Sequence, residues 1–311
     1  MCDVPALRFP EFTGEWERHK LSEVCSFYSG GTPSSSKKEY YNGNIPFIRS
    51  GELHKDYTEL FITEAGLSNS AAKLVETGDL LLALYGATSG DIAISKIKGA
   101  INQAILCIRT KQNKKFIESV WNKHVERLLQ TYLQGGQGNL SADIVKNIPF
   151  YFANSNEQDK LAKFISLLDE RIATQNKIIE KYESLIQAII YKEKMDGISK
   201  GTWQRIALCK VLQERNEKNV NGRTICSVSV SQGVVNQVEY LGRSFAAKQT
   251  SHYNIVKYGD IVYTKSPTGN FPYGIIKRSN IREDVAVSPL YGVYIPASDS
   301  IGVFLHFYFK F

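Results

Sequence analysis

The sequence predicts an α+β protein in which two mixed α/β domains are separated by one long helix. Three observations carry this prediction. Strand-like runs and turns fill residues 1–152, an uninterrupted helical pattern fills residues 153–200, and the strand-and-turn pattern returns in residues 201–311. A chain of 311 residues also suits about two domains of ordinary size. We therefore take these three ranges as a first domain, a spacer helix and a second domain.

Short apolar runs, separated by Gly-rich or polar turns, predict the strands of the first domain. The runs are Ile45–Ile48, Leu80–Tyr85, Asp91–Ile94 and Ala104–Ile108. From Lys114 onward, apolar residues recur at three- and four-residue spacing, which predicts one helix that ends before Gly135. Strands followed by a packed helix are typical of an α+β domain.

A heptad pattern dominates residues 153–200. Ser155 and Gln158 match a capping box, which predicts a helix start with Ser155 as the N-cap. Apolar residues then alternate at steps of four and three, and no Gly or Pro interrupts them before Gly197. The seam consists of Leu161, Ile165, Leu168, Ile172, Gln175, Ile179, Tyr182, Ile186 and Ile189. Because such a seam needs a partner helix, we expect a coiled coil rather than a single buried helix.

The second domain repeats features of the first. Trp16 and Trp203 head similar segments, and the Gly-Asp pairs at 78–79 and 259–260 precede similar apolar runs, at offsets of 187 and 181 residues. Similarity at a nearly constant offset indicates a duplicated domain. The second copy reaches only the beginning of the helix that follows the strands of the first copy, so we expect it to be truncated.

Composition narrows the classes of protein. The apolar runs are too short for a transmembrane helix, so we expect no membrane association. Five cysteines without a Cys-x-x-Cys pair predict neither a disulfide framework nor a zinc site, and indicate the reducing cytoplasm. Of the net charge of +7, the second domain supplies +6, from 13 Lys and Arg against 7 Asp and Glu. This excess suggests an anionic partner, although solvated surface charge explains it equally well.

Patterns of catalytic and cofactor-binding residues are absent from the sequence. The five histidines form no metal-ligand spacing, no P-loop is present, and Gly136-Gln137-Gly138 lacks a third glycine and a preceding strand. Segments 44–47 and 147–150 resemble the Asn-Pro-Pro-aromatic loop of adenine methyltransferases. Both have Ile in place of the first Pro, which favours simple strand entries. We therefore predict no cofactor, no metal and no active site.

Polar loops that contain glycine are candidates for contacting nucleic acid, because amide and hydroxyl groups pair with base edges and lysines with phosphates. The loops at 85–89 and 264–270 each follow a Gly-Asp strand, so they should occupy equivalent places in the two domains. The candidate DNA-binding residues are Lys37, Lys38, Thr88, Ser89, Gln137, Asn139, Lys265, Ser266 and Asn270. For each loop taken singly, an ordinary surface turn is the competing interpretation.

The combined motifs resemble the specificity subunits of type I restriction–modification systems. The matching segments are 4–16, 30–33, 45–48 and 147–149, followed by Glu157-Gln158 and the long seam. This resemblance covers the whole chain and implies two target recognition domains, each of which reads one half of a bipartite double-stranded DNA site. It also implies that the helix docks methyltransferase subunits, through which restriction subunits join. The seam residues Leu161, Ile165, Leu168, Ile172, Ile179, Tyr182 and Ile186 would then serve in assembly.

Two departures from the family pattern matter. Residues 151–156 replace the usual Pro-Pro-Leu stretch before the helix, and the second long helix of the family is missing after the second domain. Without that helix, we expect the seam to pair with the same helix of a second copy. The other outcome is an incomplete product that stays poorly soluble without partners. The alternative to a non-catalytic DNA-recognition subunit is a coiled-coil scaffold with protein-binding end domains. A DNA reader should bind duplex DNA with a steep inverse salt dependence and a sequence preference once its partners are present, whereas a scaffold should show neither.

Overall fold

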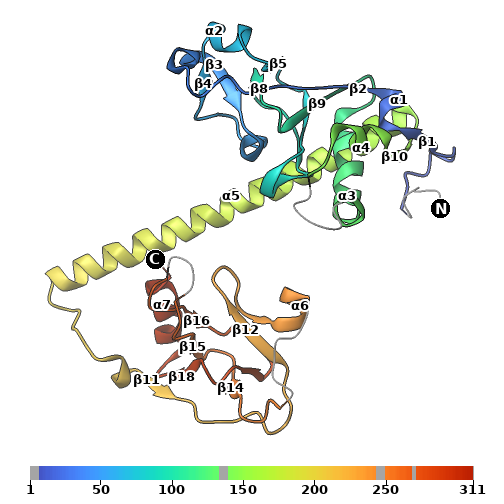
Figure 1. Ribbon diagram of the computed structural model, residues 1–311. Helices are drawn as coiled ribbons and strands as arrows, with labels where there is room; N and C mark the ends of the chain where they lie inside the picture. The colour runs from blue at the N-terminus through green and yellow to red at the C-terminus, as the bar shows by residue number, and fades with distance from the viewer. Residues whose placement is uncertain (1–6, 133–138, 243–248, 268–270, 311) are drawn as a thin grey trace. The chain divides into compact units, whose positions relative to one another are not determined.

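The computed structural model describes residues 7–132, 139–242, 249–267 and 271–310 (Figure 1). Packing divides the chain into two compact units, unit 1 (Met1–Thr174) and unit 2 (Gln175–Phe311), with the division inside the longest helix. Both units mix helices with sheets, so the predicted α+β class is confirmed. Each unit is described by itself below.

Among the residues that the structure describes, unit 1 contains ten strands, four α-helices and three 3-10 turns before the long helix. The strands are β1 (Glu17–Lys20), β2 (Cys25–Ser29), β3 (Tyr41–Ile48), β4 (Phe61–Ile62), β5 (Lys73–Val75), β6 (Leu80–Ala83), β7 (Ile92–Ile94), β8 (Gly99–Ile101), β9 (Ile105–Thr110) and β10 (Pro149–Phe152). The helical elements are α1 (Leu21–Val24), η1 (Lys38–Tyr40), η2 (Ser50–Glu52), α2 (Glu64–Ser68), η3 (Gly86–Thr88), α3 (Lys114–Tyr132) and α4 (Ala142–Asn147). The four predicted strands coincide with β3, β6, β7 and β9.

These strands form two four-stranded sheets, in the orders β2-β9-β6-β7 and β4-β3-β8-β5, and a separate ladder of β1 with β10. All four residues of β6 are buried, as its unbroken apolar run predicts for a strand covered on both faces. On one face, Leu80 and Leu82 pack with side chains from α3, α4 and β10. On the other face, Leu81 and Ala83 pack between the two sheets.

The predicted long helix is confirmed as α5 (Ser155–Ser199), with 45 residues. Its N-cap is Asn154 rather than Ser155, because the Asn154 Oδ1 accepts a hydrogen bond from Glu157 N at 3.0 Å. Gln158 does not complete a capping box. Its Nε2 instead donates to the backbone oxygen of Ala153 at 2.7 Å, which ties the helix start to the end of β10. The capping-box interpretation was therefore wrong by one residue.

Most of the seam of α5 is exposed in this chain. Leu161, Ile165 and Ile186 are half-buried, whereas the remaining apolar positions of the seam are 44–62% exposed. Every residue from Arg171 to Glu180 is exposed. Pairing of the seam with another helix therefore stays a prediction. Among the described residues, no helix is long and apolar enough to cross a membrane.

Unit 2 repeats the architecture of unit 1. After the C-terminal part of α5 its elements are η4 (Leu208–Lys210), β11 (Leu212–Glu214), β12 (Ile225–Ser229), β13 (Gly233–Asn236), α6 (Gln237–Leu241), β14 (Asn254–Val256), β15 (Ile261–Tyr263), β16 (Ile276–Arg278), β17 (Val285–Val287), β18 (Gly292–Pro296) and α7 (Asp299–Tyr308). The sheets β11-β18-β15-β16 and β13-β12-β17-β14 match those of unit 1 strand for strand. The parallel pair β12–β17 matches β3–β8, so the predicted duplication is confirmed.

The two Gly-Asp turns are built alike. Gly78 and Gly259 have φ values of +86° and +89°, which favour glycine. One carboxylate oxygen of Asp79 and of Asp260 accepts from the backbone N–H three residues earlier, at 3.0 and 2.8 Å. Each aspartate is therefore a fixed part of the turn that leads into β6 or β15.

An ion pair between a buried aspartate and an arginine stabilises each of these turns, but the arginines come from different strands. Arg109 in β9 donates to Asp79 at 2.9 Å, whereas Arg215, directly after β11, donates to Asp260 at 2.6 Å. Burial opposes ionisation of Asp79, but hydrogen bonds from Arg109 and from the turn lower the pKa of its carboxyl below the usual value. The aspartate thus occupies the same place in both units, whereas its arginine partner comes from a different strand in each.

Candidate nucleic-acid interface

The turn after β6 presents a short polar loop. Gly86 (φ +80°) opens η3, and Asp91 N donates to Thr88 O at 2.9 Å, which closes the turn. The Ser89 hydroxyl donates to Leu84 O at 3.0 Å, so it holds the loop in shape. Thr88 and Ser89 are both half-buried. Thr88 is therefore the better candidate of the two for contacting a ligand.

Contacts bring two further segments beside this loop. Leu140 N donates to Leu84 O at 2.9 Å, which places the exposed residue Asn139 next to the turn. His54 Nε2 lies 2.8 Å from Asp91 Oδ1, so the segment around His54 lies at the same end of β6. We call residues 54–57, 86–91 and Asn139 the unit 1 loop surface.

The sequence prediction missed the part of this surface that follows η2. Lys55 Nζ lies 5.0 Å from the centre of the Tyr57 ring, and Tyr57 is 56% exposed. Lys96 Nζ donates to His54 O at 2.9 Å and adds a second positive charge nearby. A lysine and a tyrosine two residues apart, between strand-like runs, were the available signal. Their nearness to Thr88 depends on the His54–Asp91 contact, which the sequence does not reveal.

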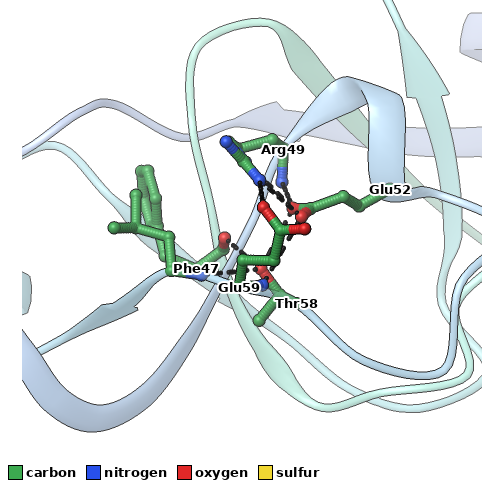
Figure 2. Close-up of polar contacts among 6 residues, drawn as sticks. Phe47, Arg49, Glu52, Thr58 and Glu59 are labelled. Atoms are coloured by element: carbon green, nitrogen blue, oxygen red, sulfur yellow. Dashed lines mark hydrogen bonds and ion pairs between the residues drawn. The ribbon is translucent and has the colours of Figure 1, made fainter.

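A buried carboxylate holds the segment between β3 and β4 in place (Figure 2). Glu52 is 3% exposed and accepts hydrogen bonds from Arg49 N, Nε and Nη2 at 3.1, 3.2 and 2.7 Å. The buried Thr58 hydroxyl lies 3.0 Å from Glu52 Oε2 and 2.9 Å from the backbone oxygen of Phe47. Arg49 Nη2 also donates to Glu59 Oε2 at 2.9 Å.

The ionisation of Glu52 follows from these contacts. Burial opposes its charged form, but the hydrogen bonds from Arg49 and Thr58 outweigh burial and lower the pKa of Glu52 to about 2. Glu52 is consequently charged at neutral pH and fully engaged within the loop. This network fixes both ends of the segment that carries Lys55 and Tyr57. The backbone from which these two side chains project is therefore held in one conformation.

Lys37 and Lys38 lie elsewhere. Lys37 is the N-cap of η1 and Lys38 is its first residue. This turn packs against α2 at the beginning of β3, whereas the segment around His54 follows the end of β3. Eight strand residues span roughly 25 Å, so the two lysines are not part of the unit 1 loop surface. Lys37 Nζ donates to Tyr40 Oη at 2.9 Å, and this bond raises the pKa of the Lys37 amine.

The equivalent loop of unit 2 follows β15, as predicted. Thr264 N donates to Ile275 O at 3.1 Å, just as Ala83 N donates to Asp91 O at 2.8 Å in unit 1. Lys265 is exposed and has φ +60°, a value that non-glycine residues seldom adopt and that often marks functional positions. Ser266 is exposed beside it. Gln137 and Asn270, which the sequence also singled out, lie outside the described residues.

The chemistry that these loops offer is hydrogen bonding and positive charge. Thr88, Asn139 and Ser266 supply hydroxyl and amide groups, and Lys55 and Lys265 supply ammonium groups. Within the described residues, no group of three or more His, Cys, Asp and Glu side chains is placed to hold a metal ion. These groups suit recognition of a polar, anionic partner.

Comparison with known proteins decides the family. The model of the type I restriction modification DNA specificity domain matches residues 13–184, which is more than half of the chain. The chain belongs to this family. This match includes all of the unit 1 loop surface and most of α5. The family predicted from the sequence motifs is therefore confirmed.

Individual relatives agree with this assignment. The specificity subunit of the type I restriction enzyme EcoR124I/EcoR124II from Escherichia coli is 27% identical over 174 residues, covering 52% of this chain and 43% of the relative. The MjaIX specificity subunit of Methanocaldococcus jannaschii is 25% identical over 240 residues, covering 68% and 55%. The chain thus spans about half the length of the curated relatives that it matches.

A solved structure shares the fold of this specificity-domain protein. The crystal structure of the type I restriction-modification S subunit from M. genitalium has a TM-score of 0.53 and 15% identity to it. The match covers 96% of this chain and 77% of the other. At this level of identity the likeness concerns the fold, which it extends over both units.

Proposed function

We propose that this chain is a non-catalytic DNA-recognition subunit in which each unit reads one half of a bipartite double-stranded site. The observation that carries the proposal is the repeat itself, because both units present a polar loop at the same place after a Gly-Asp strand. Two similar readers in one chain suit a site with two half-sequences. A subunit with this role would work in the cytoplasm, where bacterial and archaeal DNA lies.

The chemistry of the loops supports direct reading of bases. Thr88 and Asn139 in unit 1 can exchange hydrogen bonds with base edges, and Lys55 can meet a phosphate with Tyr57 beside it. In unit 2, Lys265 and Ser266 lie in the loop after β15, which corresponds to the loop after β6 in unit 1. The net charge of +6 in residues 201–311 would favour DNA at that half of the site.

We assign assembly to the exposed seam of α5. Ile172 and Ile179 are 59% and 54% exposed, and Tyr182 is 62% exposed on the same seam. Apolar side chains at heptad spacing are removed from water only when they pack against a partner helix. The partner in this proposal is a methyltransferase subunit, through which restriction subunits join. Pairing of the seam with a second copy of the chain stays the competing prediction.

The deciding experiment is selection of a randomised duplex library by the chain reconstituted with methyltransferase subunits. We expect a bipartite consensus with a fixed gap, and binding that weakens steeply with salt because lysines release counterions from phosphates. A complex that enriches no sequence and responds little to salt would contradict DNA reading. That result would favour the coiled-coil scaffold instead.

A further inference from the structure

The connection that follows β3 in unit 1 differs from the one that follows β12 in unit 2. The parallel pairs β3–β8 and β12–β17 make Ile48 and Cys226 counterparts. Beyond Cys226, β12 continues to Ser229 and returns through a turn at residues 230–232 into β13. Beyond Ile48, the chain instead leaves the sheet and forms residues 49–60 before β4 begins. We call residues 49–60 the unit 1 insertion.

Three anchors hold the unit 1 insertion against the sheets. The hydrogen-bond network around Glu52 closes its base (Figure 2). Leu53 is 2% exposed and packs in the core between the two sheets. His54 is tied to the turn after β6 by its contact with Asp91. The exposed residues 56–57 therefore project from a backbone that is held in place.

One carboxylate of this region has no partner. Asp56 is exposed and forms no hydrogen bond or ion pair with any residue that the structure describes. Lys55, its neighbour in sequence, lies over the Tyr57 ring instead, with Nζ 5.0 Å from the ring centre. The carboxylate of Asp56 is therefore free to accept hydrogen bonds from a ligand at the unit 1 loop surface. The other three carboxylates of residues 49–60 and 86–91 are paired: Glu52 and Glu59 with Arg49, and Asp91 with His54.

A free carboxylate on a surface that meets DNA selects for bases with amino groups. In the major groove, guanine and thymine present acceptor atoms, which repel a carboxylate, as phosphates do. Cytosine N4 and adenine N6 carry amino groups, which donate hydrogen bonds to it. Such a side chain weakens binding to most sequences and strengthens binding only where an amino group is in reach. It therefore contributes to specificity more than to affinity.

We propose that Asp56 accepts a hydrogen bond from the exocyclic amino group of a cytosine or adenine in the half-site that unit 1 reads. Lys55 meets the neighbouring phosphate and offsets the repulsion between that phosphate and Asp56. This inference rests on the proposed function, in which unit 1 reads one half of the site. The turn at residues 230–232 of unit 2 is exposed and carries no charged side chain. The two half-sites should therefore differ in the kind of base that is read at this place.

The test uses the full chain reconstituted with methyltransferase subunits and selection from a randomised duplex library. In one half-site of the wild-type consensus we expect a position that requires cytosine or adenine, and Asp56→Ala should reduce the preference there about tenfold. That base is then replaced by its analogue without the amino group, 2-pyrimidinone for cytosine or purine for adenine. The analogue should weaken wild-type binding about tenfold and leave Asp56→Ala binding unchanged. Glu64→Gln is the matched control, because it removes an exposed carboxylate from α2, at the other end of β3, and should keep the wild-type consensus.

Two results would overturn the assignment of Asp56 while leaving the proposed function standing. One is a bipartite wild-type consensus that Asp56→Ala leaves unchanged. The other is an analogue that weakens wild-type and Asp56→Ala binding equally, because another side chain would then recognise the amino group. Absence of any wild-type consensus would contradict the proposed reading of DNA together with this assignment, so the two kinds of failure are distinguishable.

Discussion

Arg8 and Glu157, which are 149 positions apart in the chain, form a two-point ion pair. Arg8 Nε donates to Glu157 Oε1 and Nη2 donates to Oε2, each at 2.6 Å. The glutamate side chain is fully buried and the arginine side chain is 16% exposed. The pair joins the segment before β1 to the first turn of α5, so the beginning of the long helix is fixed to unit 1.

Removing the arginine should destabilise unit 1. Arg8→Ala leaves the buried Glu157 without its partner, and we expect a loss of about 3–5 kcal/mol in the free energy of unfolding, measured by urea denaturation. Lys146→Ala is the control, because Lys146 pairs with Asp143 in an exposed helical pair that contributes less than about 0.5 kcal/mol. Equal effects of the two variants would show that the pair is not a stabilising anchor.

The Glu52 network should control the loop that it holds. In Glu52→Gln, an NH2 group, which donates, replaces one carboxylate oxygen, which accepts from Arg49. Amide exchange of residues 49–60 should therefore become at least tenfold faster. Exchange in β6 should change much less, because β6 is buried in both cores. Glu59→Gln, which alters the exposed partner of Arg49, is the matched control. Unchanged exchange in Glu52→Gln would contradict this role.

Unit 2 should lose stability in mild acid through His306. Burial, together with nearby Lys277, Lys310 and Arg278, lowers the pKa of His306 to about 4, and its Nδ1 accepts from Arg278 N at 3.1 Å. Because the pKa of His306 is lower in the folded chain than in the unfolded chain, the unfolded chain takes up the proton at a higher pH as the solution is acidified. The stabilisation is therefore complete above pH 6.5 and is lost as pH falls toward 4, by about 2–3 kcal/mol.

Exchange of β15 and β16 amides across this pH range measures the effect. His306→Asn keeps a hydrogen-bond acceptor but does not titrate, so its stability should vary less between pH 6.5 and 4. If the wild-type chain and this variant respond identically to pH, His306 is not the titrating group.

The seam of α5 should be needed for assembly and not for folding of the chain. Ile172→Asp with Ile179→Asp places two charges where a partner helix must pack, so we expect loss of the complex with methyltransferase subunits on a sizing column. Circular dichroism of the chain alone should stay nearly the same, because both residues are more than half exposed. Lys177→Asp, off the seam, is the charge control, and a complex that survives the double change would exclude the seam.

Changes in one unit should affect one half of the DNA site. Thr88→Val with Asn139→Ala removes hydrogen-bonding groups from the unit 1 loop surface, and each lost base contact should cost about 1–3 kcal/mol. Lys265→Ala should act on the other half-site and also reduce the salt dependence. Selection from a randomised library checks both. Loss of preference in both halves at once would mean that these loops are structural.

The sequence was sufficient for the parts of the fold that depend on periodicity. The seam of α5 and the Gly-Asp turns at Asp79 and Asp260 are local patterns, so the helix, the strands and the duplication could be predicted. The N-cap was missed by one residue because both Asn154 and Ser155 are good caps. The exchange of Arg109 for Arg215 could not be foreseen, because the two arginines reach their aspartates from different strands.

The candidate site was harder to predict than the fold. Thr88 and Asn139 do come together, but Lys37 and Lys38 lie at the far end of β3. The contribution of Lys55 and Tyr57 depends on the contact between His54 and Asp91, which are 37 residues apart. Contacts between loops are set by how strands pair and pack, and a single sequence carries no direct signal for them.

The middle of α5 has a consequence for how the chain behaves when it is alone. Residues Arg171 to Glu180 are exposed on every side, so only their own helical hydrogen bonds hold them. Isolated helices of this kind are marginal in water. This stretch should therefore melt and re-form independently of the two units, and a protease should cut there first. A partner that packs on the seam would remove these side chains from water, so this stretch would become stably helical only on assembly.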